Sequence, residues 1–159
     1  MDNTGDSLDL IGAYNGRGKR TGSFGGFLLA CYDDKKEEFQ SICKIGSGFS
    51  EQMLNEISLR LKNQVIRHPK SYYRFTDATK PDVWLEPTEV WEVKAADLSI
   101  SPVYLAAAGS VDVIKGISQR FPRLIHVRED KKPEDATTSG QVADIYVSCS
   151  KHQPWKQLI

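Results

Sequence analysis

The sequence predicts an all-β domain with helices, of the OB-fold class: a five-stranded, partly open Greek-key barrel with a helix between its third and fourth strands and an extra C-terminal helix. Two observations lead to this class. Five segments have the composition or alternation of strands, and one amphipathic segment separates the third from the fourth. In addition, 159 residues are enough to bury a single core without disulfides or metals.

The first three strands are predicted in the N-terminal third of the chain. Residues 8–14 are an apolar run, followed by a glycine-rich, basic turn over residues 15–22. Residues 24–32 and 39–45 are the second and third strands. The short charged segment 33–36 between them predicts an antiparallel hairpin.

A helix is predicted from Ser50, whose hydroxyl can cap its first turn, to about Gln64. The dipeptide His68-Pro69 lies beyond its end. We expect the apolar stripe of this helix to face the barrel. The stripe consists of Met53, Leu54, Ile57, Leu61 and Val65.

The last two strands are predicted over residues 90–98 and 117–128. Strict alternation in the fifth strand puts Phe121 on the face of Ile117, and therefore favours a core position for the ring. Pro122 predicts an edge or a bulge at that point. A final helix is predicted from about Ser139, with Val142, Ile145, Tyr146 and Cys149 on one stripe.

Composition excludes several classes of protein. The chain has 21 basic and 21 acidic residues and no run of the roughly 18 apolar residues that a membrane span needs. Its polar, acidic N-terminus is not a signal peptide. The three cysteines (Cys31, Cys43 and Cys149) are isolated, which predicts reduced thiols in an intracellular compartment. No spacing indicates a metal site.

Three basic segments are candidates for binding phosphates, and each has a structural alternative. The glycine-rich loop carries Arg17, Lys19 and Arg20, and is equally typical of a solvated turn. The segment 120–123 places Phe121 between cations, as in a wedge against nucleic acid, although alternation favours the core. Residues 128–131 combine two cations with Asp130, a set that suits a polyphosphate but is also typical of a charged strand end.

Several motifs occur in one order and together resemble a known family. They are Leu10-Ile11-Gly12-Ala13-Tyr14, Gly16-Arg17-Gly18-Lys19-Arg20, Gly25-Gly26-Phe27-Leu28-Leu29-Ala30, Lys44-Ile45-Gly46-Ser47-Gly48-Phe49, Val90-Trp91-Glu92-Val93-Lys94, Lys115-Gly116-Ile117-Ser118, Arg120-Phe121-Pro122-Arg123 and Val127-Arg128-Glu129-Asp130-Lys131. The chain resembles, from about Leu8 to Tyr146, the C-terminal OB domain of eukaryotic ATP-dependent DNA ligases, of the DNA ligase I type.

The resemblance implies a role in sealing nicks in duplex DNA. In such enzymes a lysine of a separate adenylation domain attacks ATP, with Mg²⁺, and forms lysyl-AMP. The AMP then passes to the 5′-phosphate of the nick, and the 3′-hydroxyl displaces it. The positions that match the motif facing the ATP phosphates are Arg128, Asp130 and Lys131. The positions that match the DNA-gripping face are Arg17, Lys19, Arg20, Arg120, Phe121 and Arg123.

The chain departs from the family pattern in two ways. It lacks the nucleophilic Lys-x-Asp-Gly motif, so we expect a fragment that is inactive alone and has no ATP or Mg²⁺ bound. His126 stands where this type of ligase commonly has arginine, so a phosphate contact there would depend on pH.

The expected organisation is a hinge over residues 1–7, the OB domain over 8–150 and a tail over 151–159. The expected partners are nicked duplex DNA and the adenylation and DNA-binding domains of the same enzyme. We expect a nuclear monomer. Two alternatives stay open: a stand-alone OB module that binds single strands, and the OB domain of an mRNA capping enzyme.

Overall fold

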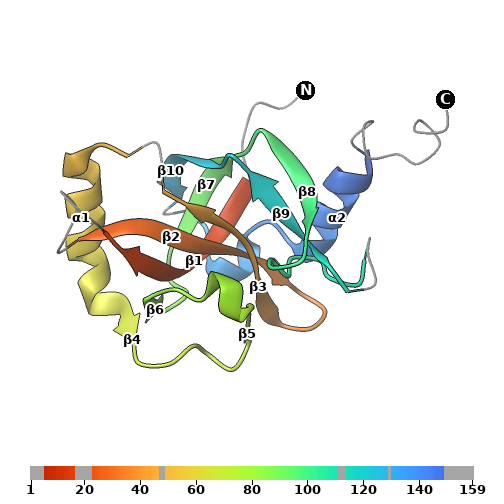
Figure 1. The fold of residues 1–159 in the computed structure, drawn as a ribbon, viewed down its shortest axis with the longest axis horizontal. Helices are drawn as coiled ribbons and strands as arrows, with labels where there is room; N and C mark the ends of the chain where they lie inside the picture. Colours follow the sequence, from red (N-terminus) through yellow and green to blue (C-terminus); the bar gives the residue numbers. More distant parts are fainter. Residues whose placement is uncertain (1–5, 17–22, 47–48, 111–113, 129, 149–159) are drawn as a thin grey trace.

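The computed structural model describes residues 6–16, 23–46, 49–110, 114–128 and 130–148. Strands dominate the fold, and a helix lies at each end of the sheet (Figure 1). The elements are β1 (Asp6–Asn15), β2 (Phe24–Asp33), β3 (Glu38–Ile45), α1 (Glu51–Leu61), η2 (Lys62–Gln64), β4 (Val65–Ile66), β5 (Tyr73–Arg74), η3 (Asp77–Thr79), β6 (Val83–Leu85), β7 (Val90–Lys94), β8 (Asp97–Ser101), β9 (Gly116–Arg120), β10 (Arg123–Arg128), η4 (Pro133–Asp135) and α2 (Ser139–Ser148).

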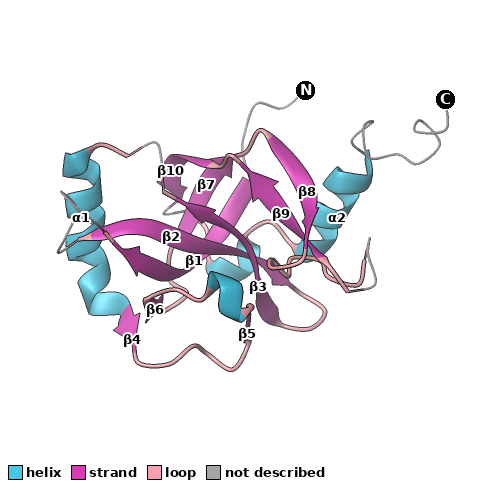
Figure 2. Cartoon of the chain, in the orientation of Figure 1, coloured by secondary structure: helices cyan, strands magenta, loops and turns pink. Residues whose placement is uncertain are grey.

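The first three predicted strands are confirmed as an antiparallel set. The sheet runs in the order β10-β7-β1-β2-β3-β5, so β1 lies near its middle (Figure 2). The β2–β3 turn is closed by Asp33, whose carboxylate accepts hydrogen bonds of 3.0 Å from the backbone N–H groups of Lys35 and Lys36. The sheet curls into a half-barrel. Because no ladder among the described strands joins β3 to β10, one side of this half-barrel is open.

Helix α1 covers one end of this half-barrel, as its apolar stripe predicts. Ser50 is its N-cap, and its hydroxyl accepts a hydrogen bond of 3.1 Å from the N–H of Met53. Leu54, Ile57 and Leu61 are buried in the main core, while Met53 packs against it half-buried.

The predicted end of this helix is wrong by one turn. The α-helix ends at Leu61, and residues 62–64 form a 3₁₀ turn. Val65, which the stripe included, is 43% exposed and begins β4. The connection after it contains the short strands β4, β5 and β6, which sequence alternation did not predict because two or three residues carry no period.

The fourth and fifth predicted strands are each broken in two, and the two breaks lie beside each other. β8 pairs with β9 and β7 pairs with β10, and residues 95–96 face the break at 121–122. Phe121 has a φ of 55°, and Pro122 has no N–H to give to a ladder. The irregularity predicted at Pro122 is therefore confirmed, whereas the core position that alternation favoured for Phe121 is wrong: the ring is 73% exposed.

A β-bulge in β10 changes which side chains face the core. Leu124 pairs with Val93 and His126 pairs with Glu92, so Ile125 is the extra residue. Leu124 and Val127 both pack against the main core, although they are an odd number of residues apart. The strict alternation predicted along this strand therefore fails at Leu124, which lies on the core side, and at Ile125, which is 41% exposed, whereas Val127 lies on the core side as predicted. Directly paired residues share a face of the sheet, and His126 pairs with Glu92 while Arg128 pairs with Val90. His126 and Arg128 therefore lie on the face of Glu92, opposite to the main core.

The C-terminal helix is confirmed, and its predicted apolar stripe is confirmed in part. Helix α2 begins at Ser139 and buries Val142, whereas Ile145 is 46% exposed. Cys31 and Cys43 are free and buried, and burial raises the pKa of the Cys31 thiol to about 12. Cys149 and the predicted tail lie outside the described residues.

Candidate functional site

Arg128 and Asp130 form a two-point ion pair where β10 ends. Arg128 donates from Nε to Oδ1 of Asp130 at 2.9 Å and from Nη2 to Oδ2 at 2.7 Å. The contact holds the pKa of the Asp130 carboxyl well below its usual range and raises that of the guanidinium. Both groups are therefore charged at neutral pH, and such forked contacts fix orientation as well as distance. Lys131, the third predicted member, follows directly and is half-buried.

Glu92 also binds this pair, and no sequence motif assigns a role to it. Its Oε1 accepts a hydrogen bond of 2.7 Å from Nη1 of Arg128. Nε2 of His126 lies 3.9 Å from the same oxygen. Glu92 is buried on β7. Residues 90–93 alternate between the two faces of the strand, with Glu92 on the face away from Trp91. This alternation was the only sequence feature that placed Glu92 on its face.

The segment that follows Lys131 folds back over the face that carries Glu92. Thr137 donates its N–H to the carbonyl of Ser7 at 2.8 Å, and its hydroxyl accepts from the N–H of Ser7 at 3.0 Å. On β1, Asp9 is fully buried on this same face, and neither of its carboxyl oxygens has a hydrogen-bond partner. The 128–131 set is therefore tied through this segment to the middle of the sheet.

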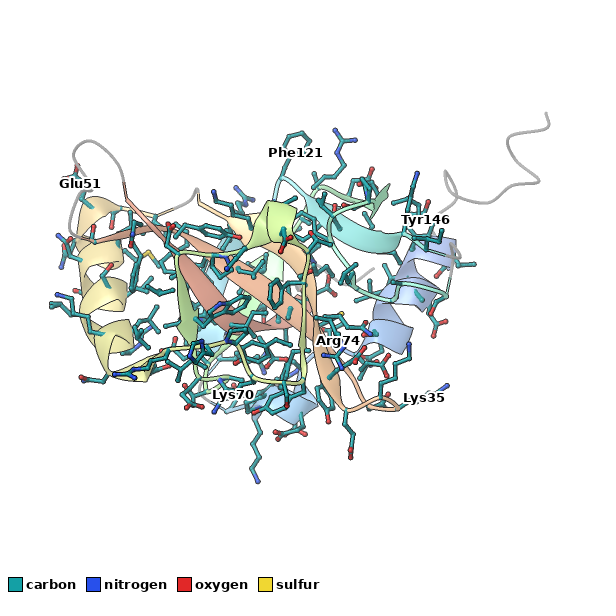
Figure 3. All side chains as sticks on the ribbon, turned by 60° about the horizontal axis from the view of Figure 1, so that its bottom comes forward. Lys35, Glu51, Lys70, Arg74, Phe121 and Tyr146 are labelled. Carbon is teal, nitrogen blue, oxygen red and sulfur yellow. The ribbon has the colours of Figure 1, made fainter. Side chains whose placement is uncertain are left out.

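The second predicted set lies at the other end of β10. Phe121 stands out from the surface at the break between β9 and β10 (Figure 3). The guanidinium carbon of Arg120 lies 5.2 Å from the centroid of its ring. Arg120 and Arg123 are both exposed, so two cations flank an exposed aromatic ring.

The structure does not bring the two sets together. The six residues of β10, Arg123–Arg128, separate them, a span of about 17 Å at roughly 3.3 Å per residue. The loop residues Arg17, Lys19 and Arg20 lie outside the described residues. The chain that leads into that loop is anchored, because Asn15 donates its N–H to Asp82 at 2.7 Å.

The aromatic side chains of β2 and β3 are not placed for stacking on bases. Phe27 and Phe39 are buried, and Phe24 and Tyr32 pack half-buried against the two core clusters. A module that binds single strands needs exposed rings along such strands. This observation weighs against the single-strand alternative.

Two further features are absent from the described residues. Among the ranges that the structure describes, no group of three or more His, Cys, Asp and Glu side chains could hold a metal ion. In the same ranges no helix is long and apolar enough to cross a membrane.

Comparison with solved structures supports the fold. The chain superposes on the ligase domain of LigD from M. tuberculosis with a TM-score of 0.64 and 18% identity, covering 85% of this chain and 38% of that one. A mycobacterial DNA ligase D complexed with ATP and MES gives a TM-score of 0.58 and 17% identity, covering 84% of this chain and 38% of that one. At these identities the likeness concerns the fold alone.

The sequence is similar to one protein family and to several curated proteins. Residues 20–131 match the family described as ATP dependent DNA ligase C terminal region. DNA ligase 1 of Arabidopsis thaliana is 66% identical over 156 residues, which cover 97% of this chain and 20% of that protein. DNA ligase 1 of Saccharomyces cerevisiae is 50% identical over 155 residues, which cover 96% of this chain and 20% of that protein. The chain thus spans about a fifth of these relatives, and it belongs to the ATP-dependent DNA ligase family, as a C-terminal region of that family.

Proposed function

We propose that this chain acts within an ATP-dependent DNA ligase that seals nicks in duplex DNA, and that it serves two steps with two separate surfaces. One surface, Arg128 with Asp130 and Lys131, faces the phosphates of ATP during adenylation. The other, Arg120, Phe121 and Arg123 with the loop 17–20, holds nicked duplex DNA during sealing. The observation that carries the proposal is the placement of the two described sets at opposite ends of β10.

The first surface fits a polyphosphate chemically. Arg128 has five N–H donors, and its contacts with Asp130 and Glu92 use three of them. One donor remains on each terminal nitrogen, and Lys131, three residues further along the chain, carries an ammonium group. In the proposed step, a lysine amine of another domain forms a bond to the α-phosphorus of ATP, and the bond from that phosphorus to the β-phosphate oxygen breaks. Arg128 and Lys131 stabilise the negative charge that develops on the leaving pyrophosphate.

The second surface fits the minor groove of a duplex. Exposed aromatic side chains can wedge against sugars or bases there, while flanking arginines bind phosphates. Phe121 between Arg120 and Arg123 has this arrangement, and its ring makes no core contact that would explain it.

The other components of the reaction follow from this assignment. ATP is a substrate, and we propose that its Mg²⁺ is held outside this chain, since the described residues form no metal site. The partners are an adenylation domain, a DNA-binding domain and nicked DNA. We propose a nuclear location and a monomeric enzyme, inactive when this chain is alone.

The proposal is tested in a chimera in which this chain replaces the matching region of Arabidopsis DNA ligase 1. Nick sealing by the chimera, with no sealing by either part alone, is the expected result. Binding experiments with the chain alone give a second test: nicked duplex should bind more tightly than a single strand of the same length. A chimera that forms lysyl-AMP but never seals, or a preference for single strands, would contradict the proposal.

A further inference from the structure

We infer that Glu92 is the positioning residue of Arg128 during adenylation, an inference that rests on the proposed function. It fixes the direction in which the guanidinium points, without touching ATP itself. Nothing in the sequence motifs assigns Glu92 this role. Three features of the structure lead to it: the position of Glu92 in the sheet, the number of donors that it engages, and the exposure of the other partner.

Glu92 lies on one of the most constrained strands of the sheet. β7 is paired on both sides, with Glu92 opposite Ser7 of β1 and opposite His126 of β10. Its side chain is 8% exposed. A carboxylate on such a strand has little freedom to move, and groups that hold a reacting residue act best from rigid elements.

Asp130 cannot supply this rigidity by itself. It follows the end of β10, and its side chain is 66% exposed. Asp130 binds Nε and Nη2 of Arg128, so the two side chains could turn together as a unit. Glu92 binds the remaining nitrogen, Nη1, and thereby ties the pair to the sheet. Without Glu92, the ion pair would persist but its direction would not be fixed.

The three contacts orient the guanidinium and do not block it. They leave one N–H on each terminal nitrogen, which is the number that a phosphate needs for a forked contact. The other basic side chain described beside Glu92 is His126, whose Nε2 lies 3.9 Å from Oε1. That distance is too long for a direct hydrogen bond, so Arg128 is the group that Glu92 holds.

The test compares single and double variants in the chimera with Arabidopsis DNA ligase 1. At saturating ATP, Glu92→Ala should lower the rate of lysyl-AMP formation about 100-fold, the cost of a misplacement of about 1 Å. It should leave the sealing of a nick that already carries 5′-AMP unchanged. Glu92→Gln keeps an oxygen that can accept from Nη1, so it should lose less than Glu92→Ala. In the Arg128→Ala background, Glu92→Ala should have no further effect, because a positioning residue acts only through its target.

Glu89 provides a matched control. It is a buried carboxylate three residues before Glu92, and Arg60 donates to it at 2.8 and 2.9 Å. Glu89→Gln should lower the thermal stability of the domain but leave the rate of lysyl-AMP formation unchanged. A purely structural role for Glu92 would give the same pattern as this control.

The outcomes separate this inference from the proposed function. If Arg128→Ala slows adenylation and Glu92→Ala does not, the positioning role is overturned and the function stands. Additive losses in the double variant, or equal losses in adenylation and sealing, would also overturn the positioning role. If Arg128→Ala itself leaves adenylation unchanged, both are overturned.

Discussion

The guanidinium carbon of Arg120 lies 5.2 Å from the centroid of the Phe121 ring, and that ring is 73% exposed at a residue whose φ is 55°. An aromatic residue gains little from such a place. Most of its surface stays in solvent, and a positive φ is costly for a side chain with a Cβ. This combination is typical of a residue whose contact lies outside its own domain.

Replacing Phe121 should therefore improve stability and harm function. Phe121→Gly removes the strained Cβ and should raise the free energy of unfolding by about 1 kcal/mol. It should also slow the sealing of a nick that already carries 5′-AMP. Urea denaturation of the chain and single-turnover sealing by the chimera measure the two effects. Phe121→Ala is the control, because it removes the ring but keeps the strain: it should slow sealing without the gain in stability.

The basic loop should contribute binding that depends on salt but not on sequence. Neutralised phosphates release counterions, so the logarithm of the affinity should fall linearly with the logarithm of the salt concentration. Arg17→Ala and Lys19→Ala should each weaken binding to any duplex and reduce that slope by about one unit. Titrations of nicked duplex at several salt concentrations measure the slope. A slope that stays the same in both variants would show that the loop does not contact DNA phosphates.

The buried carboxyl of Asp9 should make the stability of the domain depend on pH. Burial, with a further contribution from Glu134, raises its pKa to about 9. Between about pH 4 and that value, the folded state holds a proton that the unfolded state has released. Stability should therefore fall as pH rises, with this group contributing a slope of about 1.4 kcal/mol per pH unit.

Asp9→Asn should remove that dependence. Its stability relative to the unsubstituted chain should increase steadily from pH 5 to pH 8, as measured by urea denaturation at each pH. Asp33→Asn, which changes an exposed-turn carboxylate, is the comparison. A difference between Asp9→Asn and the parent that is constant across this range would show that Asp9 is ionised in the folded protein.

Much of the fold could be predicted because the long elements have a strong period. The stripe of α1 and the apolar runs of β1, β2 and β3 correspond to the elements observed. The errors fall where one residue changes the phase of a strand. Because of the bulge at Ile125, alternation assigns the wrong faces to Leu124 and Ile125, and the break at Phe121 moves a predicted core ring to the surface. Pro122 marks the position of the break, whereas no residue type marks the position of the bulge.

The site was predictable in part. Family motifs indicated Arg128, Asp130 and Lys131. A sequence motif can indicate these three residues because all of them lie in one short segment. Glu92 lies 36 residues from Arg128, and only the pairing of β7 with β10 brings them together. A contact between strands depends on their register, and here the register depends on a bulge that the sequence did not predict.

We propose that the two sets of residues at the ends of β10 serve different steps, and one comparison of variants distinguishes these steps. In the chimera, formation of lysyl-AMP from ATP and sealing of a nick that already carries 5′-AMP are measured separately for Lys131→Ala and for the double variant Arg120→Ala/Phe121→Ala. Lys131→Ala should slow the first step roughly 100- to 1000-fold, the usual effect of removing one group that stabilises developing charge, and leave the second near normal. The double variant should leave lysyl-AMP formation near normal and slow sealing. If both variants slow both steps equally, the two sets of residues do not serve different steps.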